Sequence, residues 1–273
     1  MSAITTSKLD LTFSGAELEK RREHIVEFIR EQASAAGTER AVLGLSGGID
    51  STTTAHLAVE ALGADAVHGL VMPSTVNREA NMSDAERVAE MLGLTYDVIE
   101  IEPIVEAFYD AYPEGADDQV AAGNVRVRVR AVLNYFVANH EDALVLGTGN
   151  RSEALVGYFT KYGDGAVDCL PIGNLYKGQV RQLARNLGVP EDLVTKTPSA
   201  GMWVGQTDEE ELGIDYDTLD AILALTVDGG VPKSSATDIL AAVSEEEIEH
   251  VHGLHEASAH KRQFPPAPSY GGD

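Results

Sequence analysis

Cysteine is almost absent from this chain of 273 residues, in which Cys169 is the only one. One cysteine cannot form an intrachain disulfide, and it offers no pair of thiolates for metal or sulfur chemistry. Long apolar runs are also absent, because no stretch approaches the ~20 residues that a membrane-spanning helix needs. Residues 1–10 lack the apolar centre of a signal peptide. These absences predict a cytoplasmic protein that does not work in a membrane.

Basic residues are scarce: 20 lysines and arginines face 44 aspartates and glutamates, which gives a formal net charge of −24. Such a field repels phosphates and therefore disfavours nucleic-acid binding. Two explanations of the charge are open. Either it selects basic partners over acidic ones, or it is an adaptation to molar salt, where repulsion is screened within ~3 Å. The acids are spread along the chain, which favours the second explanation and predicts a salt-loving source.

The length and the apolar content of 44% are typical of one globular domain with a full core. Residues 1–16 are polar, and we expect them to be loose. The tail at 264–273 is rich in proline and glycine and is not expected to form regular structure. One folded domain is therefore predicted over residues 17–263. Within it, the acidic segment 205–217 is predicted to be a mobile loop near the functional site.

Short apolar runs alternate with helix-like segments along the first half of the chain. This alternation predicts a parallel sheet with right-handed crossovers and helices on both faces, which is a Rossmann-like, doubly wound α/β fold. Ligands on such sheets bind at the carboxyl ends of the strands. The expected strands are 41–45, 67–72, 96–101 and 143–147, and the expected helices are 53–62, 81–92, 104–109 and 121–139.

A glycine-rich loop, Gly44-Leu45-Ser46-Gly47-Gly48-Ile49-Asp50-Ser51, follows the first expected strand and leads into a helix. Gly47 and Gly48 can adopt positive φ, so that backbone N–H groups turn inward at a helix N-terminus and form an anion site. Ser46 and Ser51 add hydroxyl donors. Asp50 would repel a phosphate unless a divalent cation lay between them. The loop therefore predicts a polyphosphate with bound Mg²⁺.

The same loop is neither a Walker A motif, which requires Gly-x4-Gly-Lys-Ser/Thr, nor a Rossmann Gly-x-Gly-x-x-Gly. An ordinary turn between a strand and a helix is the structural alternative, but two serines and an aspartate favour phosphate binding. The loop resembles the Ser-Gly-Gly-x-Asp-Ser loop of the N-type ATP pyrophosphatases. Those enzymes bind the pyrophosphate of ATP and transfer AMP to a substrate oxygen.

Three arginines, Arg126, Arg128 and Arg130, lie in the expected helix 121–139. At this spacing the outer two share a helix face and Arg128 points elsewhere. A solvated helix face is the simplest explanation of such a cluster. In a chain this acidic, however, a basic cluster favours the binding of an anion.

A second polar loop, residues 148–153, follows the fourth expected strand and opens an ordered set of motifs. The set includes Asn150-Arg151-Ser152-Glu153, Gly157-Tyr158-Phe159-Thr160-Lys161-Tyr162-Gly163-Asp164 and Pro198-Ser199-Ala200-Gly201-Met202-Trp203. Together with the first loop, this set resembles the ammonia-dependent NAD synthetase family. The similarity extends from Ser46 to about His260-Lys261-Arg262, and it implies the adenine nucleotide alpha hydrolase-like form of the fold.

The resemblance implies a role for each matching residue. ATP would contact Gly44, Leu45, Ser46, Gly47, Gly48, Ile49, Asp50, Ser51, Thr148, Lys177 and Ser199; Mg²⁺ would bind Asp50 and Glu153; and deamido-NAD would contact Arg128, Lys161, Asp168, His260 and Lys261. Two carboxylates from two strand ends suit a hard cation, and a lysine offsets the charge of a departing pyrophosphate. Outside these motifs, Glu153 would suit a surface helix and His260 a solvated or core position.

The implied reaction is the ATP-dependent amidation of deamido-NAD by ammonia, through an adenylated intermediate, to give NAD, AMP and pyrophosphate. It needs no covalent nucleophile on the protein. The resemblance also implies a homodimer, and the apolar helix at 125–137 favours one. Two alternatives remain. Another amidotransferase or thiolase with this loop is disfavoured by the motif set, the charge and the lone cysteine. A non-catalytic ATP-binding module would not require two metal carboxylates.

Overall fold

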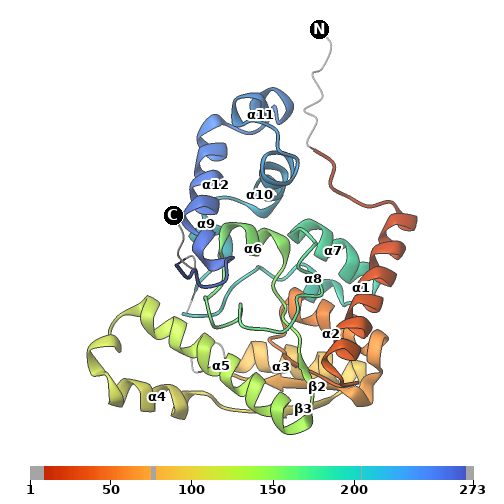
Figure 1. Cartoon of the computed structure of the whole chain (residues 1–273), viewed down its shortest axis with the longest axis vertical. Coiled ribbons are helices and arrows are strands. Elements are labelled where there is room, and N and C mark those ends of the chain that lie inside the picture. The colour runs from red at the N-terminus through yellow and green to blue at the C-terminus, as the bar shows by residue number, and fades with distance from the viewer. Residues whose placement is uncertain (1–8, 75–77, 204, 269–273) are drawn as a thin grey trace.

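The computed structural model describes residues 9–74, 78–203 and 205–268, and a parallel sheet lies at the centre of that part of the chain (Figure 1). The sheet has the order β3-β2-β1-β4. Its strands are β1 (Ala41–Gly44), β2 (Val67–Val71), β3 (Thr95–Val98) and β4 (Leu144–Val145). A parallel bridge between Leu146 and Cys169 extends it beyond β4. The predicted parallel sheet is confirmed, although β3 and β4 are shorter than expected.

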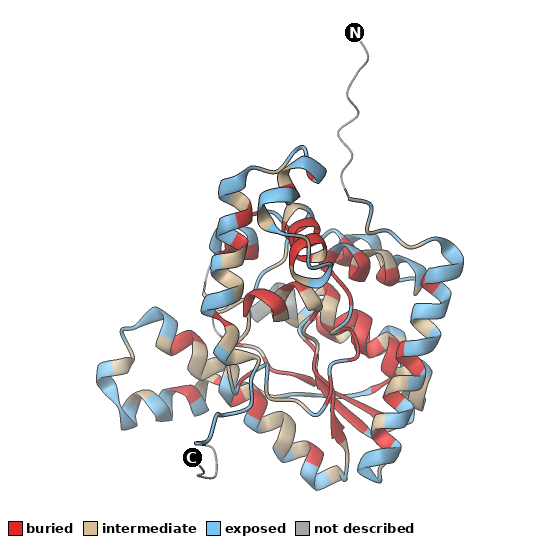
Figure 2. Ribbon diagram, turned by 45° about the horizontal axis from the view of Figure 1, so that its top comes forward, coloured by how far each residue is buried: buried red, intermediate tan, exposed pale blue. Residues whose placement is uncertain are grey.

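Helices cover both faces of this sheet, because alternate strand residues point to opposite sides. Leu43 and Val67 belong to the apolar cluster on one face, and Val42 and Leu70 to the cluster on the other. The first face carries α1 (Gly15–Ala36), α2 (Ile49–Leu62), α3 (Arg78–Leu92), α7 (Lys177–Asn186) and α8 (Glu191–Val194), and the second carries α4 (Glu102–Ala111) and α5 (Gln119–Glu141). Figure 2 shows the centre of the sheet buried between these layers, where β1 and β2 lie, whereas β3 and α4 are largely exposed. The doubly wound prediction is confirmed.

A second layer of helices packs on α6 (Arg151–Val156) and α7 around its own apolar cluster. Tyr216 and Val251 lie fully inside this cluster. Figure 1 shows the layer on the side away from α4 and α5. It consists of α9 (Asp208–Leu212), α10 (Tyr216–Ile222) with its π-helical continuation η3 (Leu223–Asp228), α11 (Lys233–Ile239), α12 (Glu245–Ala257) and the 3-10 turn η4 (Ala259–Lys261); two more 3-10 turns are η1 (Ala64–Ala66) and η2 (Pro113–Gly115).

The acidic segment 205–217 is not the loop that its composition predicted. Most of it forms α9 and the start of α10, and Leu212 is buried. The side chain of Thr207 accepts a hydrogen bond from the backbone of Glu210, and Asp215 caps α10 in the same way. Carboxylates in a first helical turn are favoured by the helix dipole. The cluster of acids therefore marks a helix start, which the prediction missed.

Several helix starts also differ from the prediction. The expected helix 53–62 begins at Ile49, so that Asp50 and Ser51 lie in the first turn of α2, and the expected helix 81–92 begins at Arg78. At the amino end, residues 9–14 have no regular secondary structure, yet Phe13 exchanges two backbone hydrogen bonds with the Gln182 side chain on α7. Residues 1–8 and 269–273 of the two expected terminal segments lie outside the described residues. No helix of the described chain has the length and hydropathy to span a bilayer.

Candidate active site

A cavity of about 340 Å³ opens at the carboxyl ends of the central strands, a volume within the usual range for small-molecule sites. Every residue predicted to contact ATP lines this cavity except Gly47, and so does Glu153. The residues come from the turn after β1, the turn after β4, the start of α7 and the segment around Ser199. The predicted ATP residues are therefore brought together by the fold, although they span more than half of the sequence.

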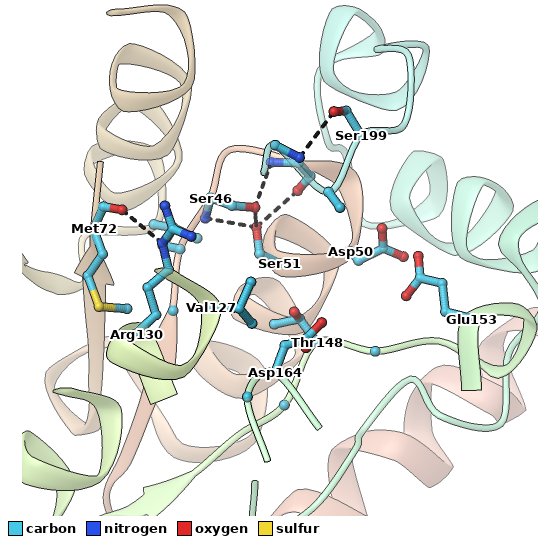
Figure 3. A pocket seen from close by; sticks show the side chains of 18 of the residues that line it. Ser46, Asp50, Ser51, Met72, Val127, Arg130, Thr148, Glu153, Asp164 and Ser199 are labelled. Atoms are coloured by element: carbon cyan, nitrogen blue, oxygen red, sulfur yellow. Dashed lines mark hydrogen bonds between the residues drawn. The ribbon is translucent and has the colours of Figure 1, made fainter. Parts of the chain in front are cut away.

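The glycine-rich loop is held by its own serines. Gly47 adopts φ 72°, which a glycine takes without strain, and Gly48 is the N-cap of α2. The hydroxyl groups of Ser46 and Ser51 lie 3.0 Å apart, and the backbone of Ser46 donates to Ser51 Oγ at 3.2 Å (Figure 3). The N-terminus of α2 thus faces the cavity with its partial positive charge, as an anion site requires.

Two carboxylates meet one ammonium group at the other side of the cavity. Lys177 Nζ lies 2.6 Å from Asp50 Oδ2 and 3.1 Å from Glu153 Oε1. Figure 3 shows the carboxylates of Asp50 and Glu153 pointing toward each other. Burial alone would lower the pKa of Lys177, but Asp50 and Glu153 outweigh this effect and raise it. The lysine is therefore a permanent cation at the junction of α2, α6 and α7.

Local sequence explains the orientation of Glu153. Asn150 is the N-cap of α6 and Glu153 is its third residue, and the two form a reciprocal capping box. The same Asn150 side chain donates to Asp50 Oδ1 at 2.9 Å. One buried asparagine thus aligns both carboxylates, and Asn-x-x-Glu after a strand is a signal by which Asn150 could have been recognised.

A third carboxylate, that of Asp208, was not predicted. Asp208 is buried and lines the cavity, and its two oxygens accept hydrogen bonds from the hydroxyls of Tyr216 (2.9 Å) and Tyr158 (3.1 Å). The ring of Tyr216 also lies 5.0 Å from Lys177 Nζ, in cation–π contact. Burial raises the pKa of Asp208, and Lys177 and the two tyrosines lower it. Nothing in the run of acids at 208–211 distinguished this residue from its exposed neighbours.

The chemistry of this corner suits a divalent cation. Three carboxylates, of Asp50, Glu153 and Asp208, surround the single ammonium of Lys177, so that two negative charges are left over when all are ionised. Burial raises the pKa of Glu153, and Asp50 and Asp208 raise it further, whereas Lys177 lowers it. No three of the described His, Cys, Asp or Glu side chains enclose a metal by themselves. Mg²⁺ is usually held by one or two carboxylates with phosphates and water, so that Asp50 and Glu153 are a pair that could hold it together with a bound polyphosphate.

Four of the five residues predicted to contact deamido-NAD lie together outside this cavity. Arg128 donates to the carbonyl of Lys161 at 3.2 Å, and Lys161 Nζ donates to the carbonyl of His260 at 2.7 Å. Lys261 Nζ donates to the carbonyl of Gly157 at 2.7 Å. A Cβ on Gly157 would lie 2.1 Å from that of Ser258, so that only glycine allows the end of α12 to approach α6 this closely.

Asp168, the fifth of these residues, lies elsewhere. Its carboxylate accepts hydrogen bonds from the backbone of Val145 at 2.8 Å and from the Tyr135 hydroxyl at 3.0 Å. It therefore links the edge strand β4 to α5, and it is not among the residues that line the cavity.

The three arginines of α5 are arranged as their spacing predicted. Arg126 and Arg130 share the half-buried face, whereas Arg128 is exposed. Arg126 Nη2 lies 3.2 Å from Glu102 Oε1 on α4. Arg130 lines the cavity and donates from Nε to the carbonyl of Met72 at 3.0 Å.

Comparisons with known proteins agree with this geometry. A family model described as NAD synthase matches residues 22–265. A protein named NH(3)-dependent NAD(+) synthetase from Halobacterium salinarum is 65% identical over 264 residues, which cover 97% of this chain and 98% of the relative. One of the same name from Archaeoglobus fulgidus is 50% identical, over 91% of this chain and 96% of the relative. The first of these organisms is a halophile, which supports the salt-adaptation explanation of the charge.

Solved structures match over similar lengths. One titled NMN synthetase from Francisella tularensis gives a TM-score of 0.82 at 36% identity, and 95% of this chain and 100% of that chain are covered. An NH3-dependent NAD synthetase from Campylobacter jejuni in complex with a nitrate ion gives a TM-score of 0.78 at 31% identity, with coverage of 92% and 99%. The fold is thus the adenine nucleotide alpha hydrolase-like one. With the family model matching residues 22–265, the chain belongs to the NAD synthase family.

Proposed function

We propose that this protein is an ammonia-dependent NAD synthetase, a ligase that forms the amide bond of NAD at the expense of ATP. The observation that carries the proposal is the convergence of Asp50, Glu153 and Lys177 beside the Ser46–Ser51 loop, in the chain of an NAD synthase family member. One cavity thus contains an anion site, at the N-terminus of α2, and a pair of carboxylates. This combination suits a nucleoside triphosphate with its divalent cation.

The first step activates the substrate. The nicotinate carboxylate of deamido-NAD attacks the α-phosphorus of ATP, and pyrophosphate leaves as the acyl adenylate forms. The loop and the N-terminus of α2 bind phosphate oxygens through N–H groups and hydroxyls. Lys177 is held in place by two carboxylates and offsets charge that develops on the leaving pyrophosphate.

The metal is part of this proposal. Mg²⁺ held by Asp50 and Glu153 would neutralise phosphate charge when bound. Asn150 would keep both carboxylates directed at the ion, and Tyr216 and Tyr158 would hold Asp208 at the edge of the same corner.

In the second step ammonia attacks the acyl carbon, and AMP leaves. No thiol is needed, and the only cysteine is unsuited to act as a nucleophile. Cys169 is buried, and burial followed by the charge of Asp168 raises the pKa of its thiol to about 11. Because the thiolate is the nucleophile in glutamine hydrolysis, this environment disfavours such a role for Cys169. Free ammonia is accordingly the proposed nitrogen source.

The surface formed by Arg128, Lys161, His260 and Lys261 is proposed as the dinucleotide site. Among the described residues, Arg128, Lys161 and Lys261 form no salt bridge. In a chain with a net charge of −24, such unpaired cations on one surface are available to an anionic ligand. Asp168 is proposed as a further contact on the adjacent edge.

We also propose a homodimer formed through α4 and α5. Val132 and Phe136 on α5 are 68% and 72% exposed, and Phe108 on α4 and Tyr112, the C-cap of α4, are 54% and 66% exposed. Val132 and Phe136 follow Arg128 at successive four-residue steps, so that the apolar stripe continues the helix face that bears the arginine. A twofold partner on this stripe would lie next to the dinucleotide.

The test is to incubate the purified chain with ATP, deamido-NAD, Mg²⁺ and ammonium at molar KCl and to quantify NAD and AMP. Equal amounts of both products are expected, and glutamine in place of ammonium is expected to give none. Because one solved relative is titled NMN synthetase, nicotinate mononucleotide is the second acceptor to test. ATP binding without AMP release would indicate a binding module instead, and efficient use of glutamine would contradict the ammonia assignment.

A further inference from the structure

The helix α5 carries three arginines whose charges have three different surroundings. Arg126 forms an ion pair with Glu102, and Arg128 is exposed at the proposed dinucleotide surface. Arg130 points into the ATP cavity (Figure 3). Its Nε donates to the Met72 carbonyl, and within the described residues neither terminal nitrogen of the guanidinium forms a hydrogen bond with the protein.

The charge of Arg130 is not neutralised by the protein. Within the described part of the chain it forms no salt bridge, and Glu102 and Asp164 act on it only over a longer distance. Burial, with Arg126 as a second cause, lowers the pKa of Arg130 to about 10. The group is still a cation at neutral pH. A half-buried, unpaired charge is unfavourable, and the binding of an anion relieves that cost.

The position of Arg130 indicates which anion it meets. Figure 3 shows Arg130 and the Asp50–Glu153 pair on opposite sides of the Ser46–Ser51 loop. The acidic pair takes the metal and the pyrophosphate in the proposed function. Arg130 contacts Met72, and Leu70, Val71, Met72 and Pro73 at the end of β2 all line the cavity. This apolar part of the lining suits a nucleoside. The phosphate between a nucleoside on this wall and a pyrophosphate at the acidic corner is the α-phosphate.

We propose that Arg130 binds the α-phosphoryl group of ATP and, after adenylation, the phosphate of the bound adenylate. This inference rests on the proposed function. A planar guanidinium can donate two parallel hydrogen bonds to one phosphate. During attack at the α-phosphorus, Arg130 would also stabilise the negative charge on the two non-bridging oxygens of the α-phosphate.

The inference is testable without turnover, because three ligands divide ATP into its parts. AMP contains the α-phosphate, pyrophosphate does not, and adenosine has no phosphate. Dissociation constants of all three are measured by calorimetry for the wild type, Arg130→Gln and Arg130→Lys, with Arg126→Gln as the matched control on the same helix face. The full-length chain is used at molar KCl, and its thermal midpoint is recorded for each variant.

Arg130→Gln is expected to raise the dissociation constant of AMP about 10- to 100-fold, as the loss of a charged, bidentate contact implies. The constants of adenosine and pyrophosphate should stay within about twofold, and Arg130→Lys should fall between the wild type and Arg130→Gln. Arg126→Gln should leave AMP binding unchanged. If Arg130→Gln does not fold, Arg130→Lys alone tests the inference, because it keeps the positive charge but cannot donate two parallel hydrogen bonds to one phosphate.

Two results would overturn the inference: unchanged AMP affinity in both Arg130 variants, or an equal loss for AMP, adenosine and pyrophosphate. Either result leaves the proposed function in place if the wild type makes NAD. Conversely, a wild type that binds AMP through Arg130 but makes no NAD would contradict the proposed function only.

Discussion

Lys177 occupies the centre of an acidic corner, and its two partners, Asp50 and Glu153, are both proposed to bind Mg²⁺. Asp50→Asn or Glu153→Gln removes one hard ligand from Mg²⁺ and is expected to lower kcat by about 100-fold and to raise the Mg²⁺ concentration needed for half-maximal rate. Glu60→Gln is the control, because Glu60 pairs with Arg22 outside the cavity. Rates equal to those of the wild type in both cavity variants would rule out the metal assignment.

Asp220 is a second buried carboxylate, and it makes stability depend on pH. It accepts hydrogen bonds from the backbone of Gly178 and from Ser152, and burial raises its pKa from 3.8 to about 6. Between these values the folded chain binds more protons than the unfolded chain, so that this group destabilises the fold as pH rises through the window. The contribution is about 2–3 kcal/mol, at about 1.4 kcal/mol per pKa unit.

Asp220→Asn should therefore remove this pH dependence. We expect the variant to gain stability relative to the wild type, that is, its free energy of unfolding minus that of the wild type should increase, from pH 4 to pH 6.5. Urea unfolding at constant high salt measures the free energy of unfolding of both proteins at each pH. Taking the difference between the two proteins at the same pH removes the contributions of the other titrating groups. A constant difference across this range would show that Asp220 is not protonated in the folded state.

At the scale of the element, α5 contributes one arginine to each of the two proposed substrate sites. Its buried face bears Arg130 at the ATP cavity, and its exposed face bears Arg128 at the dinucleotide surface. Arg128→Ala is expected to weaken deamido-NAD binding about 10-fold, the effect of one charged hydrogen bond, and to leave ATP binding unchanged. Calorimetry with each ligand measures both affinities. An unchanged affinity for deamido-NAD would contradict the assignment of Arg128 to the dinucleotide site.

The apolar stripe of α5 supports the dimer prediction. Phe136→Glu places a charge on a side chain that is 72% exposed in the monomer, so the monomer fold should tolerate it. In a dimer the same charge would be buried, and the assembly should dissociate. Sedimentation should show a dimer for the wild type and a monomer for Phe136→Glu, with unchanged circular dichroism. A fully active wild-type monomer at assay salt would contradict the proposal.

At the scale of the whole molecule, the net charge of −24 decides how stability responds to salt. Salt weakens both the surface ion pairs, such as Arg87 with Asp192, and the repulsion among 44 acids. Each exposed pair contributes little to stability, whereas repulsion acts over the whole surface. The unfolding midpoint should therefore rise from low to molar KCl. A midpoint that falls or stays constant would refute salt adaptation.

Much of the fold and of the ATP site was predictable from local sequence. The loop from Gly44 to Ser51 was recognisable because phosphate binding by backbone N–H groups needs small residues at fixed spacing. The buried strands were recognisable as short apolar runs, and Asn150 with Glu153 forms a capping box of four consecutive residues. These features depend on neighbours in the chain, so that the sequence by itself determined the sheet and the loop. Through the family resemblance it also indicated Asp50 and Glu153 as the carboxylates that are proposed to hold the metal.

Tertiary structure alone decided which distant groups meet. Lys177 contacts Asp50 across 127 positions, and Asp208 reaches the same corner because Tyr158 and Tyr216 hold it there. The composition of 205–217 suggested a loop, whereas packing of Leu212 made it a helix. Likewise, the spacing of the three arginines predicted their faces. It did not predict that Arg126 would form an ion pair with Glu102, or that Arg130 would form none with the described residues. Local patterns determine which face a side chain takes, and the packing of remote elements determines what stands opposite that face.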